Sequence, residues 1–150
     1  MKTSQQGIDL IKEFEGFRKE AYLCPGLVWT IGYGHTRGVR QGDVISESKA
    51  EEFLRGDLEE VESIVGHMIT VEIDQNQFDA LVSLVYNIGS GNFYDSTIRR
   101  LINKECWDIT KLEHAWKMWK RGGGKTLPGL VRRREAEFNL YKKDLWYAKK

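Results

Sequence analysis

Residues 15–36 read EGFRKEAYLCPGLVWTIGYGHT and differ in composition from the rest of the chain. In this stretch glycines separate residues that favour β-strands, as in the run at 28–31. The sequence Cys-Pro-Gly at 24–26 is typical of a turn. Short strands joined by tight turns are therefore predicted over residues 17–44.

Helical patterns begin on either side of this segment. Before it, residues 4–14 repeat apolar side chains on one face, and Ser4 is available as a cap. After it, Ser48 and Glu51 form a capping-box pattern that opens a helix reaching about residue 65.

A second capping pattern, Asp74 and Gln77, precedes a segment at 74–88 that is apolar nearly all round, which predicts a central, buried helix. Further helices are expected at 95–103, at 110–120 and from Pro128 to about residue 141. The glycines at 122–124 are expected to form a flexible connection. The order predicts an α+β fold: a small αβ lobe with a short antiparallel sheet, a larger helical lobe, and a cleft between them.

Length and composition exclude several classes of protein. The chain has 150 residues, the size of one compact domain, and its 41% hydrophobic and 11% aromatic residues exclude a disordered chain. No apolar run approaches the roughly 18 residues of a membrane span. Two cysteines, Cys24 and Cys106, are too few for a disulfide scaffold, and three scattered His give no metal-ligand spacing. We expect no metal, no cofactor, no stable membrane span and no internal disulfide.

Charge is balanced overall, at +1, but it is unevenly distributed. Residues 111–150 hold twelve Lys and Arg against four Asp and Glu, whereas residues 1–65 and 66–110 are both acidic. A basic segment of this kind suits an anionic partner: nucleic acid, an anionic membrane or an anionic glycan. Neutralisation of the acidic half within one domain explains the pattern equally well.

Glu15, Cys24 and Thr30 are spaced nine and six positions apart. With the flanking Glu-Gly and Thr-Ile-Gly-Tyr-Gly-His-Thr, this pattern resembles the phage-type lysozymes of glycoside hydrolase family 24, in which the middle residue is Asp or, in one branch, Cys. The resemblance continues in the blocks Phe78–Ser83, Tyr86–Gly89, Gly91–Phe93 and Pro128–Arg134. It therefore spans nearly the whole chain.

The resemblance implies a lysozyme-like fold in one domain, with an N-terminal lobe of about residues 12–60 and a helical lobe of about 1–11 and 61–150. It implies a monomeric endolysin that cleaves the β-1,4 bond between N-acetylmuramic acid and N-acetylglucosamine in peptidoglycan strands. The amino terminus shows no secretory signal. We therefore expect synthesis in the host cytoplasm and action on the periplasmic cell wall after release.

The same resemblance assigns catalytic roles to the three spaced residues. Glu15 would be the general acid, kept protonated by desolvation in a partly apolar cleft. Cys24 would direct the attacking water, or as a thiolate attack the sugar itself; the first course inverts the anomeric centre and the second retains it. Inversion is favoured because the family's spacing leaves room for water. Thr30 would hold the same water.

Other residues receive roles by resemblance alone. Tyr22, Gly32 and Gln77 would line the cleft. His35 would form a structural ion pair with Asp57 rather than act as a base. One arginine of 132–134 would reach Glu15.

Two tryptophans, Trp116 and Trp119, alternate with basic residues, which suits either sugar stacking or a helix with Trp in the core. The core position is the better interpretation for Trp116, and the two interpretations remain equal for Trp119.

Three other functions are weighed against hydrolysis. A lytic transglycosylase needs one Glu and releases an anhydro sugar. A glycan-binding pseudoenzyme would follow if loss of the usual Asp ended catalysis. A nucleic-acid-binding domain, which rests on the basic segment alone, leaves the pattern from Glu15 to Thr30 unexplained, so no nucleic-acid partner is expected.

Overall fold

The glycine-punctuated segment folds into a small antiparallel sheet, as predicted. The computed structural model describes residues 1–148. Strand β1 (Arg18–Leu23) pairs with β2 (Trp29–Gly32), with Tyr22 opposite Thr30. The register shifts by a bulge earlier in β1, which bends the ribbon.

Helices make up most of the remainder. Within residues 1–148 they are α1 (Gln5–Glu15), α2 (Glu47–Met68), α3 (Gln75–Ile88), α4 (Ser90–Tyr94), α5 (Thr97–Asn103), α6 (Ile109–Lys117), α7 (Pro128–Lys142) and the 3-10 turn η1 (Trp146–Ala148). The sequence patterns located six of these helices to within a few residues, namely α1, α2, α3, α5, α6 and α7, and they missed α4 and η1.

Helix α3 is the centre of the helical lobe, as its apolar composition predicted. Every residue from Gln77 to Val85 is buried, and the helix contacts α1, α2 and α7. The predicted capping box is present: Gln77 N–H donates to Asp74 Oδ1 and Asp74 N–H donates to Gln77 Oε1, both at 2.8 Å. Buried Asp79 accepts hydrogen bonds from the backbone N–H and hydroxyl of Ser4, which joins the start of α1 to α3.

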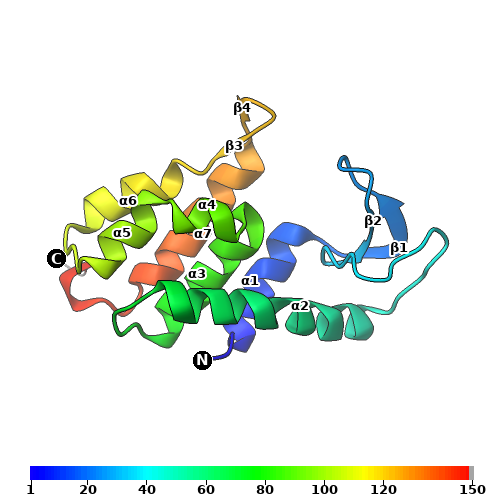
Figure 1. Ribbon diagram of the computed structural model, residues 1–150, viewed down its shortest axis with the longest axis horizontal. Helices are drawn as coiled ribbons and strands as arrows, with labels where there is room; N and C mark the ends of the chain where they lie inside the picture. The colour runs from blue at the N-terminus through cyan, green and yellow to red at the C-terminus, as the bar shows by residue number, and fades with distance from the viewer. Residues whose placement is uncertain (149–150) are drawn as a thin grey trace.

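Helix α2 runs along one side of the molecule, from the sheet to the helical lobe (Figure 1). Its cap is Ser46, whose Oγ accepts from the Lys49 N–H at 3.1 Å. The expectation that Ser48 caps this helix is wrong, because the helix already begins at Glu47 and Ser48 lies in its first turn.

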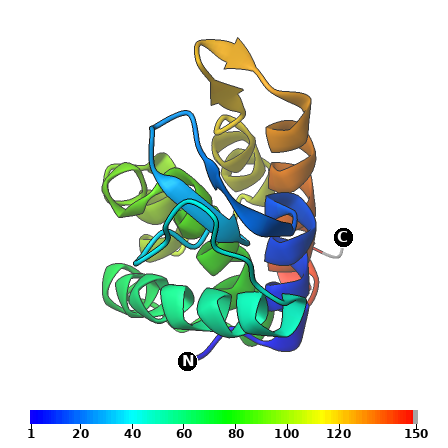
Figure 2. The same cartoon turned by 90° about the vertical axis from the view of Figure 1, so that its right-hand side faces the viewer.

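The glycines at 122–124 belong to a hairpin, which corrects the expectation of a flexible connection. Strands β3 (Arg121–Gly122) and β4 (Lys125–Thr126) pair antiparallel around Gly123 and Gly124. These two glycines have φ of 59° and 80°, the left-handed conformations that a two-residue hairpin turn requires. The hairpin projects from the helical lobe above α7 (Figure 2).

Candidate active site

Glu15 is the last residue of α1, and Gly16 ends the helix with a φ of 73° that glycine adopts without strain. The Glu15 side chain is 22% exposed, and its Oε2 lies 2.6 Å from Arg133 Nη1. A guanidinium from α7 pairs with this carboxyl, as expected from the resemblance. Arg133 is the arginine of the 132–134 run that faces Glu15.

Arg133 belongs to a buried polar network between α3, α6 and α7. Its Nε donates to Glu137 Oε2 at 3.2 Å, and its Nη2 lies 3.2 Å from the Ser83 carbonyl oxygen. Arg134 Nε lies 2.8 Å from Glu137 Oε1. Trp116, predicted to be a core residue, is fully buried and donates its indole N–H to Glu137 at 3.2 Å.

Sequence analysis did not identify Glu137 or Ser83 as parts of the site. The available signal was the spacing of Glu137 three and four residues after two consecutive arginines, which places acid and bases on one helix face.

The wall opposite Arg133 is formed by Tyr86 and Gly34. Tyr86 donates its hydroxyl proton to the Tyr33 carbonyl oxygen at 2.9 Å. Burial raises the pKa of Tyr86, and the nearby charges of Glu15 and Asp57 raise it further. The phenol therefore stays protonated and acts as a fixed donor beside the Glu15 carboxyl.

Gly34 must be glycine for this wall to approach Glu15. Its φ is 96°, and a Cβ there would lie 3.0 Å from Tyr86 Oη and 3.4 Å from Glu15 Oε1. We expect Gly34→Ala to strain the backbone and to displace the Tyr86 and Glu15 side chains by roughly 1 Å or less. This displacement should lower kcat by about tenfold. Steady-state kinetics on solubilised peptidoglycan measure this. Gly38→Ala, at a φ of 73° with open space around it, controls for backbone strain alone.

Cys24 lies in the turn between β1 and β2. Its N–H donates to the Val28 carbonyl at 3.0 Å, and its thiol is partly exposed. The backbone N–H of Val28 and then that of Gly26 lower the pKa of the Cys24 thiol by favouring the thiolate. Buried Thr30 also donates to the Val28 carbonyl at 3.0 Å. The structure therefore brings Cys24 and Thr30 together at this turn.

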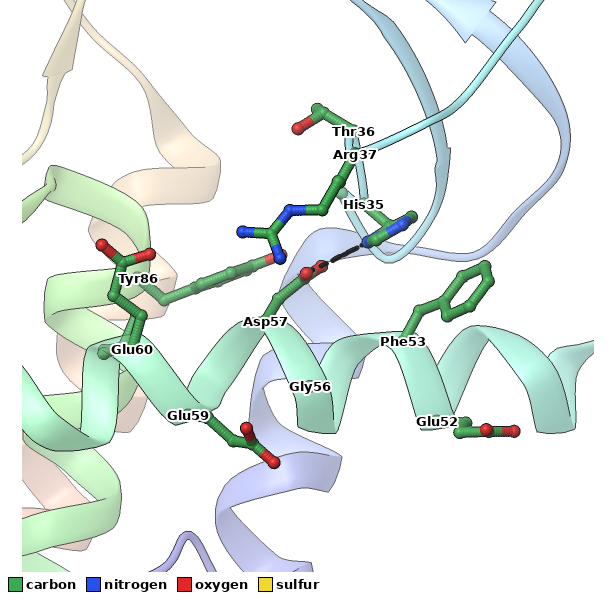
Figure 3. Close-up of a pocket in the computed structure, with 12 residues that line it drawn as sticks. His35, Thr36, Arg37, Glu52, Phe53, Gly56, Asp57, Glu59, Glu60 and Tyr86 are labelled. Atoms are coloured by element: carbon green, nitrogen blue, oxygen red, sulfur yellow. Dashed lines mark hydrogen bonds and ion pairs between the residues drawn. The ribbon is translucent and has the colours of Figure 1, made fainter.

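His35 and Asp57 are paired, as expected from the resemblance. His35 Nδ1 lies 2.8 Å from Asp57 Oδ2, and the imidazole stacks on Phe53 with ring centroids 4.3 Å apart. Figure 3 shows the pair on the wall of a cavity of about 680 Å³, between α2 and the loop after β2. Gly34 and Tyr86 line the same cavity, so it adjoins Glu15.

A second cavity opens on the other side of Glu15. It has a volume of about 650 Å³ and is lined by Glu15, Arg133 and the first turn of α7. Asn87 and Leu130 line both this cavity and a further one of about 450 Å³ that contains Trp119. The cavities of about 650 Å³ and 450 Å³ therefore form a groove that runs from Glu15 toward the β3–β4 hairpin.

The three expected cleft residues lie in different places. Tyr22 is half-buried on β1, and the Arg18 guanidinium lies over its ring, with Cζ 4.0 Å from the ring centroid. Gly32 is buried, and a Cβ there would meet Ala50 of α2 at 3.0 Å, so it serves packing; Gly34 is the glycine at the carboxyl. Gln77 caps α3 and lines a separate cavity with Tyr141. The structure does not bring Gln77 to Glu15.

The sequence profile described as phage lysozyme matches residues 12–137. The chain belongs to the phage lysozyme family. It is 43% identical over 143 residues to an endolysin of Acyrthosiphon pisum secondary endosymbiont phage 1, a match covering 94% of this chain and 98% of the relative. It is also 43% identical to an endolysin of Bacillus phage B103, of which it spans 54%.

Solved structures of phage lysozymes and related proteins share this fold. The muramidase domain of SpmX from Asticaccaulis excentricus superposes with a TM-score of 0.87 at 38% identity, over 93% of this chain and 97% of that one. The endolysin of Escherichia coli O157:H7 phage FAHEc1 gives a TM-score of 0.85 at 36% identity, over 97% and 96%. The expected α+β lysozyme-like fold and family are thus confirmed, and the protein is a glycoside hydrolase of the lysozyme type.

Within residues 1–148, no helix has the length and apolarity needed to cross a membrane. The same residues contain no group of three or more His, Cys, Asp or Glu side chains that could hold a metal ion. Cys24 and Cys106 are both free thiols.

Proposed function

We propose that the protein is a muramidase that hydrolyses the β-1,4 bond between N-acetylmuramic acid and N-acetylglucosamine, with Glu15 as general acid. The single observation that carries this assignment is the position of Glu15: its carboxyl, held by Arg133, lines a groove that runs toward the β3–β4 hairpin, and it adjoins a further cavity beyond Gly34 and Tyr86. A polymer needs such an open-ended groove, whereas a small substrate needs an enclosed pocket.

Protonation of the departing oxygen is the proposed task of Glu15. Cleavage develops oxocarbenium charge on the sugar ring, and a carboxylic acid beside the leaving oxygen must supply a proton as the bond breaks. A substrate in the groove displaces water from a carboxyl that is only 22% exposed beforehand, which favours its neutral form. Arg133 opposes this effect and fixes the direction of the carboxyl.

Water attack from the opposite face is the proposed task of Cys24 and Thr30. A thiolate at Cys24 takes one proton from water while the water oxygen bonds to the anomeric carbon, and the Thr30 hydroxyl orients that water. The lowered pKa of Cys24 supports this assignment, because the thiolate is the form that accepts a proton. A second course, direct attack by the thiolate, would form a thioglycosyl intermediate.

The basic carboxy-terminal segment suits a cell-wall substrate. Residues 111–150 carry its excess of Lys and Arg, and two of these cations, Arg121 and Lys125, lie on the β3–β4 hairpin next to the groove. Attraction to anionic murein follows from this charge. We propose that the protein acts on the cell wall as a monomer.

Product analysis tests the proposal. Digestion of purified peptidoglycan is expected to give fragments that gain one water and end in a reducing sugar. Proton NMR during the first minutes is expected to show the α anomer, since inversion of a β bond gives α. Anhydro products would instead identify a transglycosylase, and an initial β anomer would identify Cys24 as the nucleophile.

A further inference from the structure

A second carboxylate, Glu137, lies behind Arg133 and has no part in the mechanism above. It stands one helical turn after Arg133 on α7, and its side chain is completely buried. Burial of an isolated carboxylate is strongly unfavourable, so Glu137 needs hydrogen bonds and ion pairs that offset the loss of water.

Both carboxylate oxygens of Glu137 are fixed by neighbouring groups. Oε2 accepts from the Ser83 hydroxyl at 2.5 Å and from Arg133 Nε at 3.2 Å. Oε1 accepts from the Trp116 indole at 3.2 Å and lies 2.8 Å from Arg134 Nε. Helices α3, α6 and α7 each contribute a donor, so the carboxylate cannot rotate without losing several hydrogen bonds.

Glu137 in turn fixes Arg133. The Arg133 guanidinium is planar, and its donors point along set directions. With Nε held by Glu137 and Nη2 held by Ser83 at 3.2–3.3 Å, Nη1 can only point to Glu15, at 2.6 Å. The direction of the Arg133–Glu15 ion pair is therefore set from the side that faces away from the groove.

Arg134 balances the negative charge of this cluster, but its own buried guanidinium is incompletely hydrogen-bonded. It is completely buried, its Nη2 donates to Asn87 at 2.8 Å, and within residues 1–148 its Nη1 has no hydrogen-bond partner. Well-packed apolar residues would serve stability at least as well as an incompletely paired buried cation. Two arginines oppose Glu15 and Glu137, so the cluster is neutral when both acids are ionised.

We propose that Glu137 is a positioning residue for Glu15: it orients Arg133 and, balanced by Arg134, sets how strongly the cluster favours the ionised Glu15. The inference rests on the proposed acid role of Glu15. The other ionisable groups around Glu15 are Glu13 of α1 and Arg132 of α7, which line the same cavity, and Tyr86 of α3 and Asp57 of α2, which line the cavity beyond Gly34. The variants below change none of these.

Removing the Glu137 charge is the first test. In Glu137→Gln the cluster gains one net positive charge, which favours ionised Glu15. Activity requires protonated Glu15, so the high-pH limb of the pH–kcat profile is expected to move to lower pH by about one unit. This displacement corresponds to roughly tenfold lower kcat on the alkaline side. Glu135→Gln, which removes an exposed charge of the same sign from α7 outside the cluster, is the matched control and should leave the limb in place.

Removing the Arg134 charge tests the direction in which the high-pH limb moves. In Arg134→Met the net charge falls by one, and the high-pH limb is expected to move to higher pH by a similar amount. The double variant Arg134→Met/Glu137→Gln restores neutrality and should bring the limb back toward that of the wild type. A purely structural role lowers kcat at every pH and cannot produce displacements of opposite sign.

The outcomes separate this inference from the proposed function. If Glu15→Gln is inactive while the limb stays in place in Glu137→Gln and Arg134→Met, the positioning role is refuted and the acid role stands. Should Glu137→Gln fail to fold, as thermal melting would show, the direction of the Arg134→Met displacement decides alone. Retained activity in Glu15→Gln refutes the proposed function itself.

Discussion

Glu15→Gln is expected to lower kcat on peptidoglycan by about 10³-fold, within the range that general acid catalysis supplies. Glutamine keeps the size of the side chain and can still accept a hydrogen bond from Arg133, so the groove should hold its shape. What it cannot do is deliver a proton to the departing oxygen. Turbidity loss of a peptidoglycan suspension, followed over hours, measures the residual rate.

The matched control for this variant is Glu135→Gln. Glu135 is an exposed acid on α7, two residues after Arg133, and it forms no hydrogen bond or ion pair within residues 1–148. It should retain wild-type activity. Co-sedimentation with insoluble peptidoglycan should show that Glu15→Gln still binds. Residual activity above a few per cent in Glu15→Gln would contradict the acid role.

Substitution of Cys24 is expected to give the second-largest effect. Cys24→Ser should lower kcat by about 10²-fold, because a hydroxyl does not ionise near neutral pH and cannot accept a proton from water. Cys24→Asp should remain active or improve, since an aspartate is ionised there. Cys106→Ser, at the other free thiol, should behave as wild type.

The activity of the wild type and of Cys24→Asp is expected to change with pH in a defined direction. Hydrogen bonds lower the pKa of the Cys24 thiol, and activity should rise as the pH climbs through that value. In Cys24→Asp the corresponding acid limb should move to lower pH, because carboxyls have a reference pKa of about 3.9. Equal activity of Cys24→Ser and wild type would show that the sulfur has no chemical role.

Local sequence patterns predicted the helices and the sheet because apolar periodicity, caps and turns act over a few residues. The capping box at Asp74 and Gln77 is an example. The same reasoning failed for the glycines at 122–124, since a run of glycines is compatible with both a loose connection and a tight hairpin. Only pairing of the flanking residues distinguishes the two.

The site was harder to predict because it depends on contacts between distant segments. Glu15 and Arg133 are 118 residues apart, and which arginine faces the acid depends on the phase of α7. The resemblance therefore indicated that one arginine of 132–134 would reach Glu15 without indicating which one. Gln77 illustrates the converse: its local role as a cap was evident, yet resemblance alone had placed it in the groove.

Helix α2 limits how the groove can widen. The segment that holds the sheet leaves the helical lobe at Gly16 and returns along this one continuous helix, Glu47–Met68, so only two chain crossings connect the two parts. Any change in aperture must bend this rod or rotate the sheet about Gly16. Gly56, in the middle of the rod, lines the cavity next to Glu15 and has the lowest intrinsic helix propensity of any residue except proline. We expect the flexibility of the α2 turn at Gly56 to limit how wide a glycan strand the groove admits.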